Sequence, residues 1–125
     1  MNQMIILLIQ PGEKPALAEI SGTLESMQKM VGGYIQVLYL FDDPIALVCN
    51  EEGNLLGLPL NRGLRDGCGR IYDTIAGTFF LCGAPPDTDH LDSLPEGLVG
   101  KYQRRFASPE VFINIGGTLL AFPYL

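Results

Sequence analysis

The feature that most constrains this fold is a continuous apolar run near the start of the chain. Residues 4–9 read MIILLI, and the run ends at Pro11-Gly12, a pair typical of turns. Six residues make a short helix, whereas an uninterrupted apolar run between turn residues is typical of a strand that is covered on both faces. We therefore expect residues 4–9 to be a central strand of a sheet.

Other segments predict further strands around this one. They are rich in β-branched, aromatic and other apolar residues and are bounded by turn residues. These segments are residues 15–20, 34–40, 45–49, 55–60, 71–81 and 111–115, of which 55–60 is interrupted by Gly57 and Pro59 and is expected to be a bent or edge strand. Gly77 predicts a bulge or a close approach, and Gly53 is expected at a positive φ in a tight turn. Residues 61–70 show little periodicity and predict an exposed loop.

Two segments predict helices. Thr23 is a suitable N-cap for a helix that carries apolar residues at helical spacing up to Val31, and Gly32-Gly33 supplies a left-handed stop. A second helix is predicted from an apolar stripe at intervals of four, with Ser93 and Glu96 at the spacing of a capping box. The stripe consists of Leu94, Leu98, Tyr102 and Phe106.

The length of 125 residues predicts one domain, residues 1–125, and 47% hydrophobic against 18% charged residues is globular. The predicted class is α+β: a mixed, mostly antiparallel sheet of about five strands, with one helix packed on a face and a second helix in the C-terminal half. The opening order strand, strand, helix, strand, strand is compatible with a β-grasp-like arrangement.

Composition excludes several classes of function. A net charge of −6 gives no electrostatic drive toward nucleic acid, and no apolar run approaches the roughly 20 residues of a membrane span. Three cysteines without a Cys-x-x-Cys pair, and a start without signal-peptide features, predict free thiols in the cytoplasm. No metal-ligand spacing, nucleophile elbow or phosphate-binding loop is present, so neither a metal nor a cofactor is expected.

The stretch from residue 45 to residue 62 is the most informative candidate site. If the chain reverses at Gly53, then Asn50, Asn61 and Arg62 meet at one end of the sheet, next to Glu51 and Glu52. Amide and guanidinium groups suit a polar small molecule or a peptide backbone. The alternative is that these are turn residues, an Asx-turn former and an ion-pair partner.

Two further chemistries stay open for the same region. The arginines Arg62, Arg65 and Arg70 alternate with glycines and suit an anion-binding loop, unless Asp66 neutralises them. A hydrolase-type enzyme acting on an anionic or amide substrate would use Asp73 or Glu51 as a base and Arg62 or Arg65 as the anion holder.

Acidic clusters and the C-terminal tail suggest interactions with proteins. Two clusters, at residues 42–52 and 87–96, could imitate nucleic acid and make the chain a decoy for a nucleic-acid-binding host protein. Residues 116–125 are apolar and predict either an extra strand or a patch for homo-oligomerisation. The leading hypothesis is a non-catalytic binding protein for an unknown protein partner or small polar ligand.

Several blocks resemble, in order, the family named domain of unknown function 3846. The blocks are Val31-Gly32-Gly33-Tyr34, Asn50-Glu51-Glu52-Gly53, Gly57-Leu58-Pro59-Leu60-Asn61-Arg62 and Ile75-Ala76-Gly77-Thr78-Phe79-Phe80. The resemblance covers residues 4–82 and fades past Pro85. It implies a bacterial cytoplasmic accessory protein linked to phages or other mobile elements, and it brings no catalytic residues. Gly63 and residues 66–69 depart from the pattern, so the anion-loop hypothesis has no family support.

Overall fold

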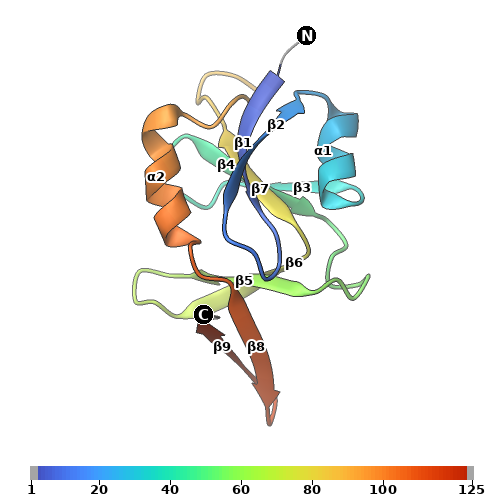
Figure 1. The fold of residues 1–125 in the computed structure, drawn as a ribbon, viewed down its shortest axis with the longest axis vertical. Coiled ribbons are helices and arrows are strands. Elements are labelled where there is room, and N and C mark those ends of the chain that lie inside the picture. Colours follow the sequence, from blue (N-terminus) through green and yellow to red (C-terminus); the bar gives the residue numbers. More distant parts are fainter. Residues whose placement is uncertain (1–2, 124–125) are drawn as a thin grey trace.

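The computed structural model describes residues 3–123 and is built around a five-stranded sheet in the order β2-β1-β7-β4-β3 (Figure 1). Its strands are β1 (Gln3–Ile9), β2 (Ala16–Ser21), β3 (Ile35–Leu38), β4 (Ile45–Asn50) and β7 (Phe79–Gly83). Every neighbouring pair is antiparallel, so the predicted α+β class is confirmed and the sheet is antiparallel throughout rather than mixed. The predicted opening order is also confirmed, and the β-grasp comparison rests on that order alone.

The apolar runs form the inner strands of this sheet. All residues of β4 and β7 are buried, and β7 is the middle strand. The run at residues 4–9 is an inner strand, as expected, between β2 and β7. It is not covered along its whole length on both faces, because the side chain of Ile5 is 36% exposed.

Helix α1 (Leu24–Val31) covers one face of the sheet. The side chain of Thr23 accepts a hydrogen bond from the Ser26 N–H, and Gly32 ends the helix at a φ of 80°. Met27 and Val31 are buried against Phe80 and its neighbours in this apolar layer. The predicted start and stop of this helix are therefore confirmed.

Helix α2 (Glu96–Arg105) lies on the opposite face (Figure 1). Its apolar stripe is confirmed, since Leu94, Tyr102 and Phe106 are buried in the core and Leu98 packs against it. The predicted capping box of Ser93 and Glu96 is wrong. The Ser93 hydroxyl instead accepts a hydrogen bond from the Ile5 N–H at 2.9 Å, and the helix begins after Pro95 without a side-chain cap.

The loop predicted at residues 61–70 is wrong, because β5 (Leu60–Arg65) pairs with β6 (Ile71–Ala76) in a separate two-stranded sheet. Residues 51–57 form a turn, so the strand predicted at 55–60 is also wrong apart from Leu60. In that turn Gly57 has the positive φ of 68°, and Gly53 does not. Gly77 has a φ of 83° beside Leu58 and separates β6 from β7, which confirms the predicted close approach.

The last two strands, β8 (Glu110–Ile115) and β9 (Thr118–Pro123), form a hairpin that projects from the rest of the fold (Figure 1). Gly116 and Gly117 join them at φ values of 59° and 87°, which only glycine adopts readily. The strand expected in residues 116–125 therefore pairs with β8 rather than with the core sheet. Residues 124–125 of that prediction lie outside the described chain.

Candidate functional site

The seven residues predicted to bind a ligand lie in two different places. Asn50, Glu51, Glu52 and Asp73 line a recess beside β3, whereas Asn61, Arg62 and Arg65 are on β5. Of the three residues expected to meet at one end of the sheet, Asn61 and Arg62 do contact each other, whereas Asn50 bonds to Val31 and Glu52 instead. We therefore describe the two groups separately.

Arg62 is a buried side chain, 1% exposed, whose donors are taken up by the protein itself. Its Nε and Nη2 donate to the Phe106 carbonyl at 3.2 and 3.1 Å, and Nη2 also donates to the Glu13 carbonyl at 2.6 Å. Its Nη1 donates to the carbonyl and to Oδ1 of Asn61, at 3.4 and 2.8 Å. All five donors of the guanidinium group therefore have partners, and burial lowers the pKa of Arg62. This geometry is that of a structural clamp.

The two buried asparagines also bind backbone. Asn61 Nδ2 donates to the carbonyls of Ile9 and Gly77, both at 2.9 Å, and so joins β5 to the core sheet. Asn50 Nδ2 donates to the Val31 carbonyl at the end of α1, at 3.1 Å, and its Oδ1 accepts from the Glu52 N–H at 2.8 Å. Both amides thus hold neighbouring segments in place.

Arg65 pairs with Glu110 at the base of the β8–β9 hairpin. Arg65 Nη1 donates to Glu110 Oε1 and Arg65 Nη2 donates to Glu110 Oε2. Glu110 Oε1 also accepts the Gly63 N–H at 2.9 Å. The Glu110 side chain is only 6% exposed, and this contact raises the pKa of Arg65. The partner of Arg65 is therefore Glu110, which the sequence did not indicate.

The four remaining residues line what we call the acidic recess, a cavity of about 320 Å³. It lies between β3, the turn after β4, and β6, and its lining contains three carboxylates and no Lys or Arg. Its lining residues are Gln36, Leu38, Cys49, Asn50, Glu51, Glu52, Gly53, Asn54, Leu55, Asp73, Thr74, Ile75 and Ala76. Burial, and then the charge of Asp73, raises the pKa of the Cys49 thiol to about 11. Cys49 is therefore protonated near neutral pH and is not an activated nucleophile.

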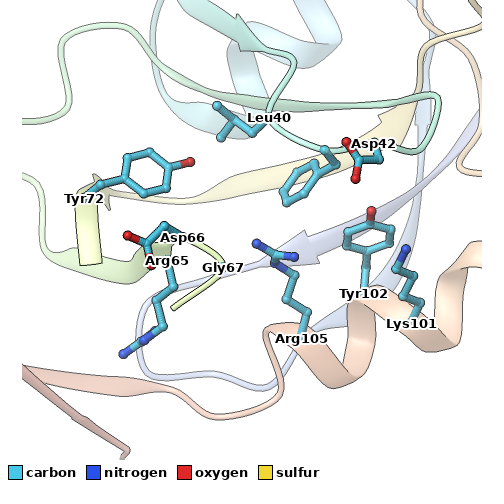
Figure 2. A pocket seen from close by; sticks show the side chains of 10 residues that line it. Leu40, Asp42, Arg65, Asp66, Gly67, Tyr72, Lys101, Tyr102 and Arg105 are labelled. Carbon is cyan, nitrogen blue, oxygen red and sulfur yellow. The ribbon is translucent and has the colours of Figure 1, made fainter. Parts of the chain in front are cut away.

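A second cavity, which we call the arginine recess, has a volume of about 340 Å³ and lies where α2 faces β6 (Figure 2). Arg105 reaches into it from α2 and Tyr72 from β6, while the side chain of Arg65 points away from both. The Arg105 guanidinium carbon is 4.9 Å from the centre of the Phe41 ring. The complete lining is Leu40, Phe41, Asp42, Arg65, Asp66, Gly67, Tyr72, Lys101, Tyr102 and Arg105.

Arg105 is the available cation of this recess. Lys101 donates to Asp43 at 2.6 Å and Arg65 binds Glu110, but no carboxylate within residues 3–123 pairs with Arg105. A guanidinium group stacked on one ring and facing Tyr72, which is 56% exposed, suits a carboxylate or another flat anionic group. Sequence reasoning missed Phe41, Tyr72 and Arg105. The available signal was the spacing of four between Lys101 and Arg105, which places both on one helix face.

Asp43 binds two residues that line the arginine recess, Lys101 and Tyr102, and its contact with them depends on pH. It accepts hydrogen bonds from Lys101 and from the buried Tyr102 hydroxyl, both at 2.6 Å. The bond to Lys101 and then the bond to Tyr102 lower the pKa of Asp43, whereas burial and Asp43 raise the pKa of Tyr102.

We therefore predict that Asp43→Asn lowers the melting temperature at neutral pH but has little effect in strong acid. A carboxylate with a depressed pKa in the folded state stabilises the fold above its unfolded pKa, and this contribution is lost as the pH falls through the folded value. Thermal unfolding from pH 7 down to about pH 2 should show the two proteins converging below about pH 4. A constant difference at every pH would contradict this assignment.

The two recesses adjoin along β6 and the segment that includes β3. On one wall, Tyr72 lines the arginine recess and the next four residues line the acidic recess. On the other wall, Leu40 lines the arginine recess and Leu38 lines the acidic recess. We call this combined depression the β6 groove. One of its ends holds Glu51, Glu52 and Asp73 without any Lys or Arg, and the other holds Arg105 together with the carboxylates Asp42 and Asp66. Within residues 3–123, no cluster of three His, Cys, Asp or Glu side chains is arranged to hold a metal ion.

Comparison with known proteins returned a family but no individual relative. The family model described as domain of unknown function (DUF3846) matches residues 2–107. No curated protein and no solved structure matches the chain. The match confirms the predicted resemblance and extends it past residue 82, through α2, so that among the described helices and strands only β8 and β9 lie beyond it. The chain therefore belongs to the family of domain of unknown function 3846.

Proposed function

We propose that this chain is a non-catalytic binding protein that takes an extended segment of a partner protein into the β6 groove. The observation that carries the proposal is the way in which β6 lines the groove. Five successive residues, from Tyr72 to Ala76, face the two recesses. Because neighbouring side chains of a strand point to opposite faces, a lining by consecutive residues indicates that the groove follows the edge of β6.

The edge of β6 that faces away from β5 pairs with no other strand of the described chain, and its open part is residues 71–74, because Ile75 and Ala76 are buried and the turn at Gly53 lies against Ala76. The strand has β5 on one side only, since the second sheet contains just these two strands. An unpaired edge presents backbone N–H and C=O groups, and addition of an extended peptide to such an edge is a common mode of recognition. On the opposite wall, Gln36, Leu38 and Leu40 alternate along the chain and so offer side chains rather than backbone.

The charges at the two ends favour one direction for the bound segment. β6 begins at the arginine recess and ends at the acidic recess. A peptide that pairs antiparallel, the slightly more stable arrangement, would begin beside Glu51 and Glu52 and end beside Arg105. The expected ligand therefore carries Lys or Arg in its first half, opposite the three carboxylates of the acidic recess, and a single Asp or Glu in its second half, opposite Arg105.

Binding is favoured over hydrolysis by the positions of the charged groups. A hydrolase using Asp73 or Glu51 as a base needs Arg62 or Arg65 to hold the anion, and both arginines are occupied elsewhere by backbone carbonyls or Glu110. Neither helix of the described chain has the length and apolar character of a membrane crossing. The proposed setting is the cytoplasm of a bacterium, and the family resemblance suggests a partner connected with phages or mobile elements.

The proposal is tested with a phage-displayed library of random dodecapeptides selected on the purified chain. We expect enriched sequences with basic residues before acidic ones. Their affinity should fall about tenfold or more in the double variant Glu51→Lys, Glu52→Lys, because two attractive charges become repulsive. Binding is measured by fluorescence anisotropy with labelled synthetic copies of the selected peptides.

A matched control makes the same change of charge elsewhere. The double variant Asp87→Lys, Asp89→Lys alters exposed carboxylates in a loop that does not line the β6 groove. It should retain peptide affinity within about twofold. Failure to select peptides, or equal losses in both double variants, would overturn the proposal.

A further inference from the structure

The β8–β9 hairpin has one face made almost entirely of exposed apolar side chains. Residues directly opposite each other in an antiparallel pair share a face. The register pairs Val111 with Phe122, Ile113 with Leu120, and Ile115 with Thr118. The five apolar members of this set, which we call the apolar hairpin face, are between 37% and 61% exposed.

The other face of the hairpin is different. It carries Glu110, which binds Gly63 and Arg65 of β5, followed by Phe112 and Asn114 along β8. Phe112 is partly buried together with its opposite residue, Ala121. The hairpin is therefore attached to the fold at its base through this second face, while the apolar hairpin face has no partner in the described chain.

A two-stranded hairpin that projects into water is at best marginally stable alone. It needs a third strand or a packed face, and an uncovered edge without charges promotes association with another chain. Residues 111–123 contain no charged residue at all. Recognition of this face by ion pairs is therefore excluded, and shape and apolar area must supply the contact.

We propose that the apolar hairpin face binds the same face of a second copy of this chain. Two copies related by a two-fold axis would bring identical, self-complementary residues together, as in most homodimers. The hairpin projects from the fold (Figure 1), so two hairpins can meet away from the acidic surfaces of the two bodies. This association is independent of the β6 groove.

The area is sufficient for a dimer of moderate affinity. A fully exposed large apolar side chain presents roughly 150–200 Å², so five side chains at these exposures offer on the order of 400 Å² per copy. Two copies would cover on the order of 800 Å² of apolar surface, which corresponds to an interface of about 1,200 Å² if about 65% of it is apolar. Stable complexes begin at about this size, so a micromolar dissociation constant is expected.

The test is sedimentation equilibrium of the complete chain across concentrations that bracket a micromolar dissociation constant. The apparent mass should rise from 13.6 kDa toward twice that value. Leu120→Lys should weaken dimerisation at least about tenfold, because it places a charge from each copy into the apolar contact.

Leu119 provides the matched control. It is 38% exposed against 37% for Leu120, but it pairs with Asn114 and therefore lies on the other face. Leu119→Lys should still dimerise within about threefold of the original chain. Circular dichroism and thermal unfolding would establish that both variants are folded. The proposal would be overturned if the chain stays monomeric, and binding of the monomer to neutral phosphatidylcholine vesicles would then show that the face contacts lipid instead. Equal losses of dimerisation in the two variants would also overturn it.

Discussion

Arg62→Met is expected to lower the free energy of unfolding by about 3–5 kcal/mol. The side chain lies fully inside the protein, where its five donors bind carbonyls of Glu13 and Phe106 and both oxygens of Asn61. Methionine fills the space of the aliphatic stem but is shorter than arginine and donates nothing. Each carbonyl that loses its donor in a buried site costs about 1–3 kcal/mol, partly offset because no charge is then buried.

Urea unfolding of this variant measures the effect directly. Arg62→Lys should be intermediate, because an ammonium group keeps the charge but cannot match the planar fork that reaches three segments. Arg104→Met is the control. Arg104 is exposed and has no ion pair within residues 3–123, so its removal should change stability by about 0.5 kcal/mol or less. Equal stabilities for Arg62→Met and the original chain would refute the clamp.

Gly83→Ala is expected to be the second most damaging of these changes, with a loss of about 3 kcal/mol. A Cβ at Gly83 would lie 2.3 Å from the backbone oxygen of Ser93 and 3.3 Å from that of Asp92. Gly83 and Asp92 exchange two backbone hydrogen bonds, and the following Leu94 N–H donates to the Ile5 carbonyl at 2.8 Å. The clash therefore cannot be relieved by rotating a side chain, and this segment must move away from β1 and β7.

Gly97→Ala provides the comparison for this second prediction. Gly97 is an exposed residue in the first turn of α2, and a Cβ there would meet nothing within 4 Å. Alanine favours the helix, so stability should be unchanged or raised by up to about 1 kcal/mol. Differential scanning calorimetry of both variants tests the pair. A Gly83→Ala variant that melts within a degree or two of the original would show that the backbone yields more easily than expected.

The sequence predicted those helices and strands whose buried side chains are apolar. The runs in β1, β4 and β7 and the stripe of α2 carry hydrophobic side chains, and their periodicity indicates which of them are covered. Strand β5 was missed because Asn61 and Arg62 are polar yet buried. Their most distant partners are Ile9 at the end of β1, Glu13 in the turn after it and Phe106 at the end of α2, which are 44 to 52 residues away and beyond any local pattern.

Only some of the candidate site residues lie together in the structure, for a related reason. Asn50, Glu51, Glu52 and Asp73 do line one recess, because the turn after β4 folds against β6. The arginine recess depends on where the end of α2 lies relative to β6, and spacing along a helix does not reveal which strand the helix faces. Asn61 and Arg62 were the polar residues that looked most suited to a ligand, but their side chains bind backbone carbonyls and hold segments of the fold together.

The different burial of the three cysteines has a practical consequence. Burial raises the pKa of the Cys82 thiol to about 12, and Cys49 is similarly protected, whereas Cys68 is exposed. Alkylating reagents attack accessible thiolates, so a maleimide dye should couple selectively to Cys68 without any mutagenesis. Cys68 lies in the turn between β5 and β6, next to Gly67 of the arginine recess. The natural chain thus provides its own attachment point for an optical reporter beside the groove.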